Sequence, residues 1–132
     1  MSAIANYFKS NGKNVGGFDK TPTEITTDLK KMGIHIHFED AVDLIPNEFK
    51  NKSNTIVIYT PAVPKNHTEL NYFINEDFTV LKRSEILGEI TKNTFCFAVA
   101  GTHGKTTTST ILGHVLKEAG TNATSFLGGI SE

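Results

Sequence analysis

A short glycine-rich stretch, residues 101–106 (G-T-H-G-K-T), holds the residue types best suited to binding phosphate. Gly101 and Gly104 let the backbone turn tightly, so that successive N–H groups and the start of a following helix can face an anion. Lys105 adds a mobile positive charge for the β- and γ-phosphates, and Thr106 places a hydroxyl where it can ligate Mg²⁺. These residues predict a site for the phosphates of a nucleotide.

The segments on either side of this loop support the prediction. An unbroken apolar run over residues 95–100 predicts a buried parallel strand, and a helical pattern begins at about Thr107. The helix is expected to bury one apolar face and to end at Gly120. That face consists of Ile111, Leu112, Val115, Leu116 and Ala119.

The loop departs from the usual P-loop pattern. G-x-x-x-x-G-K-[ST] would need glycine at position 99, where the chain has Val99, so the loop is the shorter form G-T-x-G-K-T. A glycine-rich turn that only connects two elements is the alternative interpretation. The strand before the loop and the helix after it favour nucleotide binding.

Residues 98–108 (A-V-A-G-T-H-G-K-T-T-T) resemble the ATP loop of the Mur ligase family. The resemblance implies an ATP- and Mg²⁺-dependent ligase in which Lys105 and Thr106 are catalytic and Thr106 ligates the metal. It also implies that the ATP phosphates contact Gly101, Thr102, His103, Gly104, Lys105, Thr106 and Thr107. His103 is expected either to contact phosphate or a metal-bound water, or to shape the loop.

The histidine in the loop resembles two branches of the family, one that joins L-alanine to UDP-N-acetylmuramate and one of murein-peptide ligases. Residues 1–5 (M-S-A-I-A) resemble the continuation of a G-x-G-G-x-G-M-S sequence and favour the first branch. The resemblance implies a cytoplasmic enzyme of peptidoglycan synthesis that activates the lactyl carboxylate as an acyl phosphate. A stand-alone nucleotide- or UDP-sugar-binding module without catalysis remains the alternative from a different class.

The first third of the chain is typical of part of a dinucleotide-binding βαβ unit. Residues 1–10 predict a helix with Ile4 and Phe8 on one face, and residues 14–19 predict a strand that ends in Asp19. No strand or glycine loop precedes this helix, so we expect the chain to begin inside the motif. Asp19 is expected either to bind the UDP-sugar or to be a turn acid after the strand.

A second predicted substrate segment follows the apolar strand over residues 55–59. Two prolines stop strand pairing and stiffen the loop, which suits one wall of a ligand crevice but also any strand-to-helix connection. Residues 59–67 (Y-T-P-A-V-P-K-N-H) resemble the segment with which this family meets the uridine part of its substrate. The resemblance implies that Thr60, Pro61, Ala62 and Val63 bind the UDP-sugar.

Alternating strands and helices predict an α/β fold. Residues 1–93 are expected to form a UDP-sugar-binding, Rossmann-like doubly wound parallel sheet whose first strand and glycine-rich loop are missing. Residues 94–132 are expected to begin a truncated ATP-binding domain, with its first strand, P-loop and helix and a second strand at about 126–130. A chain of 132 residues is too short for a complete three-domain ligase, so we expect the fragment alone to be inactive.

Several elements between these segments carry predictions about burial. A capping box at residues 21–24 predicts a helix that buries Ile25, Leu29 and Met32, and a further helix over 67–75 is expected to turn Leu70, Phe73 and Ile74 inward. His35 and His37 share one face of a short strand. A solvated strand face is the favoured interpretation, and a metal site is the alternative.

Composition excludes several classes of protein. A net charge of −1, from 13 basic and 14 acidic residues, provides no field for nucleic acid or an anionic membrane, so phosphate recognition must be local. No apolar stretch is long enough to span a bilayer, and we expect no signal peptide. The single cysteine, Cys96, is expected to be a buried structural thiol in a reduced cytosolic protein.

Overall fold

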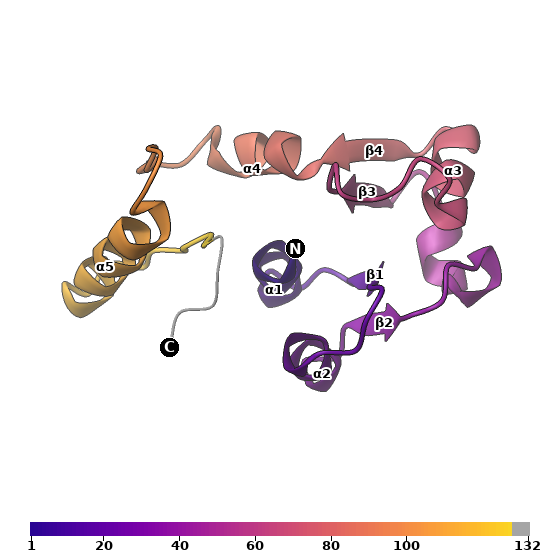
Figure 1. Ribbon diagram of the computed structural model, residues 1–132, viewed down its shortest axis with the longest axis horizontal. Coiled ribbons are helices and arrows are strands. Elements are labelled where there is room, and N and C mark those ends of the chain that lie inside the picture. The colour runs from indigo at the N-terminus through magenta and orange to yellow at the C-terminus, as the bar shows by residue number, and fades with distance from the viewer. Residues whose placement is uncertain (128–132) are drawn as a thin grey trace. The chain divides into compact units, whose positions relative to one another are not determined.

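The structure is a computed structural model that describes residues 1–127. The chain forms two compact units, Met1–Thr94 and Phe95–Glu132. Most helices and all the strands of the described residues belong to the first unit, whereas the second contains one long helix (Figure 1). Each unit is described by itself below.

The first unit contains four short strands that form two separate parallel pairs. Strand β1 (Gly16–Phe18) pairs with β2 (His35–His37), and Gly16 lies opposite His35. Strand β3 (Ile56–Tyr59) pairs with β4 (Thr79–Lys82) in the same parallel sense. The α/β class is therefore confirmed. Among the described residues the strands form these two pairs, and the single doubly wound sheet expected over residues 1–93 stays a prediction.

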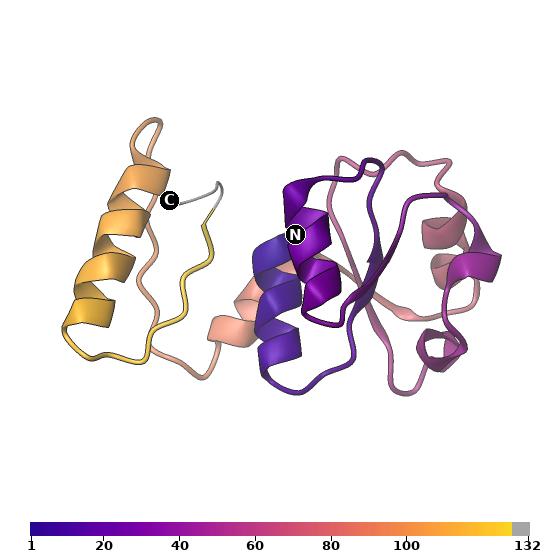
Figure 2. The same ribbon diagram turned by 90° about the horizontal axis from the view of Figure 1, so that it is seen from below.

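Helices cover the strands of the first unit from two sides. Figures 1 and 2 show α1 (Ser2–Ser10), α2 (Glu24–Lys31) and α4 (Arg83–Thr91) on one side of the strands. The other side carries α3 (Thr68–Asn75) and two 3₁₀ turns, Val42–Leu44 and Asn47–Lys50. The buried apolar side chains of the unit are Ile4, Leu29, Ile34, Ile45, Phe78 and Ile86. In the described part of the chain, no helix has the length and apolarity needed to cross a bilayer.

The start of α2 differs from the sequence prediction. The capping residue is Thr23, whose hydroxyl accepts the backbone N–H of Thr26, while the Thr26 hydroxyl accepts the N–H of Thr23 in return. The helix therefore begins two residues later than predicted, because a second threonine completes the box. Of the expected stripe, Leu29 is buried, whereas Ile25 and Met32 are exposed.

The helix of the second unit, α5, runs from Lys105 to Glu118 and so begins two residues before the predicted start. The expected strand over residues 95–100 is wrong: this segment has no strand assignment, and Cys96 is exposed rather than buried. The side chains of Phe95 and Ile111 are also largely exposed, at 87% and 59%. A strand needs a partner for its backbone hydrogen bonds, and no described residue of this unit provides one. The strand expected at about 126–130 lies mostly outside the described residues.

Candidate phosphate loop and the cluster around α3

The predicted phosphate loop leads directly into α5. Gly104 is the N-cap of this helix and has φ 74°, a left-handed conformation that glycine adopts without strain. Residues 101–108 are all exposed. Among the described residues, the N–H of Thr108 bonds to Gly104 O at 2.9 Å, but no acceptor faces the backbone N–H groups from Gly101 to Thr107.

Lys105 lies over the same loop. Its Nζ donates to the carbonyl oxygens of Gly101 at 2.6 Å and Thr102 at 3.1 Å, so the ammonium is held beside the free amides rather than pointing away from them. The hydroxyl of Thr106 has no partner among the described residues. A run of free N–H groups at a helix start, one cation and one free hydroxyl is a donor set that fits polyphosphate and Mg²⁺.

The two segments predicted to bind the UDP-sugar follow β1 and β3, which belong to different strand pairs. Asp19 comes directly after β1; its N–H donates to His37 O at 3.1 Å, and its Oδ1 accepts the N–H of Thr21 at 3.2 Å. Asp19 is therefore a turn acid in this structure, and a role in binding sugar stays a prediction. The segment Thr60–Val63 begins with a turn in which Val63 N–H donates to Thr60 O at 3.1 Å.

Arg83 is a cation that the sequence analysis missed. Burial lowers the pKa of the α-amino group of Met1; the Arg83 charge lowers it further, and Asp19 opposes the shift. The charges of Arg83 and Asp19 thus both act on the start of α1. Arg83 directly follows β4, and a cation at the carboxyl end of a parallel strand was the available signal.

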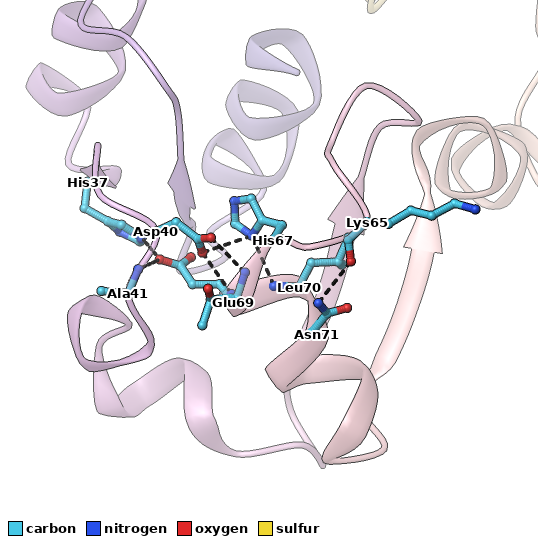
Figure 3. Close-up of polar contacts among 9 residues, drawn as sticks. His37, Asp40, Ala41, Lys65, His67, Glu69, Leu70 and Asn71 are labelled. Atoms are coloured by element: carbon cyan, nitrogen blue, oxygen red, sulfur yellow. Dashed lines mark hydrogen bonds and ion pairs between the residues drawn. The ribbon is translucent and has the colours of Figure 1, made fainter.

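The buried carboxylate of Glu69 and the half-buried ring of His37 face each other (Figure 3). Glu69 in α3 is only 5% exposed, and its Oε1 accepts from His37 Nε2 at 2.7 Å and from Ala41 N–H at 3.1 Å. A carboxylate can only accept, so Nε2 is the donor. The solvated face expected for His37 is wrong, because this ring packs inward, whereas His35 is exposed. No metal-binding cluster occurs among the described residues.

A second pair lies beside the first. Asp40 accepts the first two N–H groups of α3, from Thr68 at 2.7 Å and Glu69 at 3.0 Å. Nδ1 of His67, the N-cap residue, lies 3.3 Å from the N–H of Leu70 and 3.2 Å from Asp40 Oδ1. The side chains of Asp40 and His67 thus accept hydrogen bonds from the first three N–H groups of α3. Asp40 belongs to the loop after β2.

The hydrogen bonds of Asp40 lead us to expect that the free energy of unfolding falls in acid. Burial raises the pKa of this carboxyl, but the N–H groups of Thr68 and Glu69 and the charge of His67 outweigh it, and the pKa falls below its ordinary value of 3.8. The stabilisation is therefore present above pH 3.8 and is lost as the pH falls through the lower value of the folded state. We expect Asp40→Asn to cost about 0.5–1 kcal/mol at neutral pH, because the negative charge at the start of α3 is lost.

Urea unfolding followed by circular dichroism measures this effect at neutral pH and again below the folded-state pKa of Asp40. The difference in unfolding free energy between the wild type and Asp40→Asn should shrink in acid. Glu39→Gln is the matched control, since the neighbouring Glu39 side chain is exposed and makes no hydrogen bond or ion pair with other described residues. A difference that stays constant with pH would contradict the assignment.

Comparisons with known proteins agree along the whole chain. The model of the Mur ligase family, catalytic domain, matches residues 1–94. A UDP-N-acetylmuramate--L-alanine ligase of Flavobacterium psychrophilum is 61% identical over 132 residues, which are 100% of this chain and 29% of that protein. A ligase of the same name from Parabacteroides distasonis is 55% identical and is matched by 98% of this chain over 28% of its own length.

Solved structures give the same result. UDP-N-acetylmuramate-alanine ligase MurC from Thermotoga maritima superposes with a TM-score of 0.87 at 37% identity, covering 99% of this chain and 30% of that one. A UDP-N-acetylmuramate:L-alanyl-γ-D-glutamyl-meso-diaminopimelate ligase from Neisseria has a TM-score of 0.78 at 26% identity, covering 91% of this chain and 36% of that one. The chain spans about 29% of the length of the curated relatives it matches.

The resemblance of the loop to the Mur ligases is thus confirmed by matches that extend from the first helix to the last. With a family model over residues 1–94 and close relatives over the full length, the chain belongs to the Mur ligase family.

Proposed function

We propose that this chain is the part of an ATP-dependent ligase that contributes to two sites, one for ATP and one for UDP-N-acetylmuramate, and that the full-length protein joins L-alanine to the sugar nucleotide. The observation that carries this proposal is the exposed loop Gly101–Thr107, whose N–H groups lack acceptors among the described residues and lie beside Lys105. The names of relatives that are more than 50% identical support the choice of alanine and UDP-N-acetylmuramate as substrates.

In this proposal the loop binds the ATP phosphates and neutralises part of their charge. The free N–H groups would hold the phosphates in line, Thr107 would add a hydrogen bond, and Lys105 would neutralise charge on the transferred phosphoryl group. His103 would shape the turn or contact phosphate. Mg²⁺, when bound, would supply further charge neutralisation, and the hydroxyl of Thr106 is the group of this loop that would ligate it.

We also propose that the first unit is the main part of a doubly wound sheet. In the usual strand order 3-2-1-4-5, the first strand lies at the centre of the sheet. A chain that supplies the second to fifth strands would form the pairs 3-2 and 4-5, which matches β2–β1 and β3–β4. Asp19 and Thr60–Val63 would then lie at the carboxyl ends of strands on either side of that centre, where such folds bind nucleotides.

Ligation of a tripeptide in place of alanine is the second candidate, because the name of the Neisseria ligase includes such a peptide. The 61% identity to an alanine ligase, against 26% to the Neisseria protein, favours alanine. A direct test uses a full-length ligase in which this chain occupies the stretch that it matches in its relatives. UDP-N-acetylmuramate and ATP are supplied with either L-alanine or L-alanyl-γ-D-glutamyl-meso-diaminopimelate, and ADP and ligated product are quantified.

We expect one ADP for each alanine joined, and little product with the tripeptide. Preference for the tripeptide would replace the first candidate with the second. Binding of UDP-N-acetylmuramate without any formation of ADP would instead indicate a binding module without catalysis.

A further inference from the structure

We propose that Asp40 and His67 are positioning residues for the nucleotide sugar: they hold the segment Thr60–Val63 in register with the end of β1 that carries Asp19. This inference rests on the proposed function of those two segments. Neither residue is among those predicted to bind the UDP-sugar: Asp40 lies in the loop after β2, and His67 ends the stretch 59–67 after Thr60–Val63. They act through contacts that join the two strand pairs.

The first step is the attachment of α3 to the loop after β2. The carboxylate of Asp40 binds the N–H groups of Thr68 and Glu69, although it lies 28 and 29 residues away in the sequence. A negative charge at a helix N-terminus is favourable, and these N–H groups would otherwise lack partners. Asp40 therefore links the β1–β2 pair to the helix that connects β3 with β4.

The second step is the attachment of the predicted substrate segment to α3. Residues 60–67 form two consecutive turns, in which Val63 N–H donates to Thr60 O and His67 N–H donates to Pro64 O, both at 3.1 Å. His67 ends the second turn and caps α3 through the N–H of Leu70. A displacement of His67 would therefore move the whole segment relative to the helix.

The third step leads from His67 to Asp19. The ring of Phe18, the last residue of β1, packs edge-on against the ring of His67 with 4.7 Å between centroids. Phe18 is followed directly by Asp19. One chain of contacts, Thr60–Val63 to His67 to Phe18, thus connects the two predicted substrate segments, and the Asp40 carboxylate fixes the orientation of the His67 ring within it.

The Nδ1 atom of His67 has two competing partners. Without a proton it accepts the N–H of Leu70, and with a proton it donates to Asp40 Oδ1. Nε2 is buried and has no partner among the described residues, so Nδ1 is the ring atom that meets both groups. Asparagine offers an acceptor for the helix N–H and a donor for the carboxylate at the same time, and it is a preferred N-cap residue. This makes His67→Asn the conservative variant.

The test measures steady-state kinetics of the full-length ligase and its variants. We expect His67→Ala to raise KM for UDP-N-acetylmuramate about tenfold, because a bound substrate must then order the segment itself. The values of kcat and of KM for ATP should stay close to those of the wild type, since neither residue is placed at the reacting atoms. His67→Asn should restore most of the affinity for the sugar nucleotide, and Asp40→Asn should show an intermediate KM.

Glu76→Ala serves as the control, because Glu76 is exposed at the opposite end of the same helix. An unchanged KM for UDP-N-acetylmuramate in folded His67→Ala, or a fall in kcat in place of a rise in KM, would overturn the positioning role. Should His67→Ala fail to fold, Asp40→Asn and His67→Asn decide the question by their KM ratio. An inactive wild-type ligase would contradict the proposed function and not the positioning role. The dissociation constants of UDP-N-acetylmuramate for the same variants, measured by calorimetry, would then decide the positioning role.

Discussion

Replacing Lys105 with alanine in the full-length ligase is expected to lower kcat for ATP-dependent ligation by at least about 100-fold, the scale seen when one preorganised donor is removed from a charged transition state. The Lys105 ammonium is the cation of the loop and lies 2.6 Å from Gly101 O, next to the free N–H groups. Formation of ADP and binding of UDP-N-acetylmuramate are measured on the same preparation. The second should remain nearly unchanged, because the segments predicted to bind the sugar belong to the first unit.

Lys117→Ala is the matched control for this variant. Lys117 is an exposed cation in the last turn of the same helix, so its removal changes the net charge equally without touching the loop. We expect its kinetics to match those of the wild type. Equal losses of ATP turnover and of UDP-sugar binding in folded Lys105→Ala would contradict the division of labour between the two units.

The sequence predicted what depends on local patterns. The turn at Gly104 and the helix after it were predictable, because glycine, lysine and threonine in this order are typical of a loop that opens a helix. That this loop binds phosphate stays a prediction. The expected strand over residues 95–100 was wrong, because an apolar run describes what a segment could bury and not whether a neighbour is present to cover it. The exposure of Phe95 and Cys96 follows from the same lack of a partner among the described residues.

The cluster around α3 could not be predicted from periodicity. The apolar pattern places Leu70, Phe73 and Ile74 inward, yet the residue of α3 that is buried is Glu69, and Ile74 is 50% exposed. The partner of Glu69 is His37, which lies 32 residues earlier in the sequence. Local sequence patterns do not reveal a contact between residues so far apart in the chain. The sequence contains only a weak indication of polar contacts at the start of α3, namely a polar N-cap residue followed by an acid at the second position of the helix.

Replacing Glu69 with alanine is expected to destabilise the first unit strongly, by about 2 kcal/mol, because it leaves one part-buried donor without an acceptor and removes one of the two acceptors of another. The donor that loses its acceptor is His37 Nε2, whereas the N–H of Ala41 keeps its bond to Glu39 O at 3.1 Å. For a unit of this size, the loss should lower the melting temperature by at least about 8 °C. Thermal and urea unfolding followed by circular dichroism measure both quantities, and Glu76→Ala is the exposed control on the same helix.

Glu69→Gln separates the hydrogen bonds from the size of the side chain. Glutamine keeps one acceptor oxygen in nearly the same place, so its cost should be only about 1 kcal/mol. A double-mutant cycle then tests the pair itself: His37→Ala should cost less in the Glu69→Ala background than in the wild type, since the acceptor of the imidazole is already gone. Additive losses would show that the two side chains stabilise the fold independently. In that case the 2.7 Å contact between His37 Nε2 and Glu69 Oε1 would not be what joins β2 to α3.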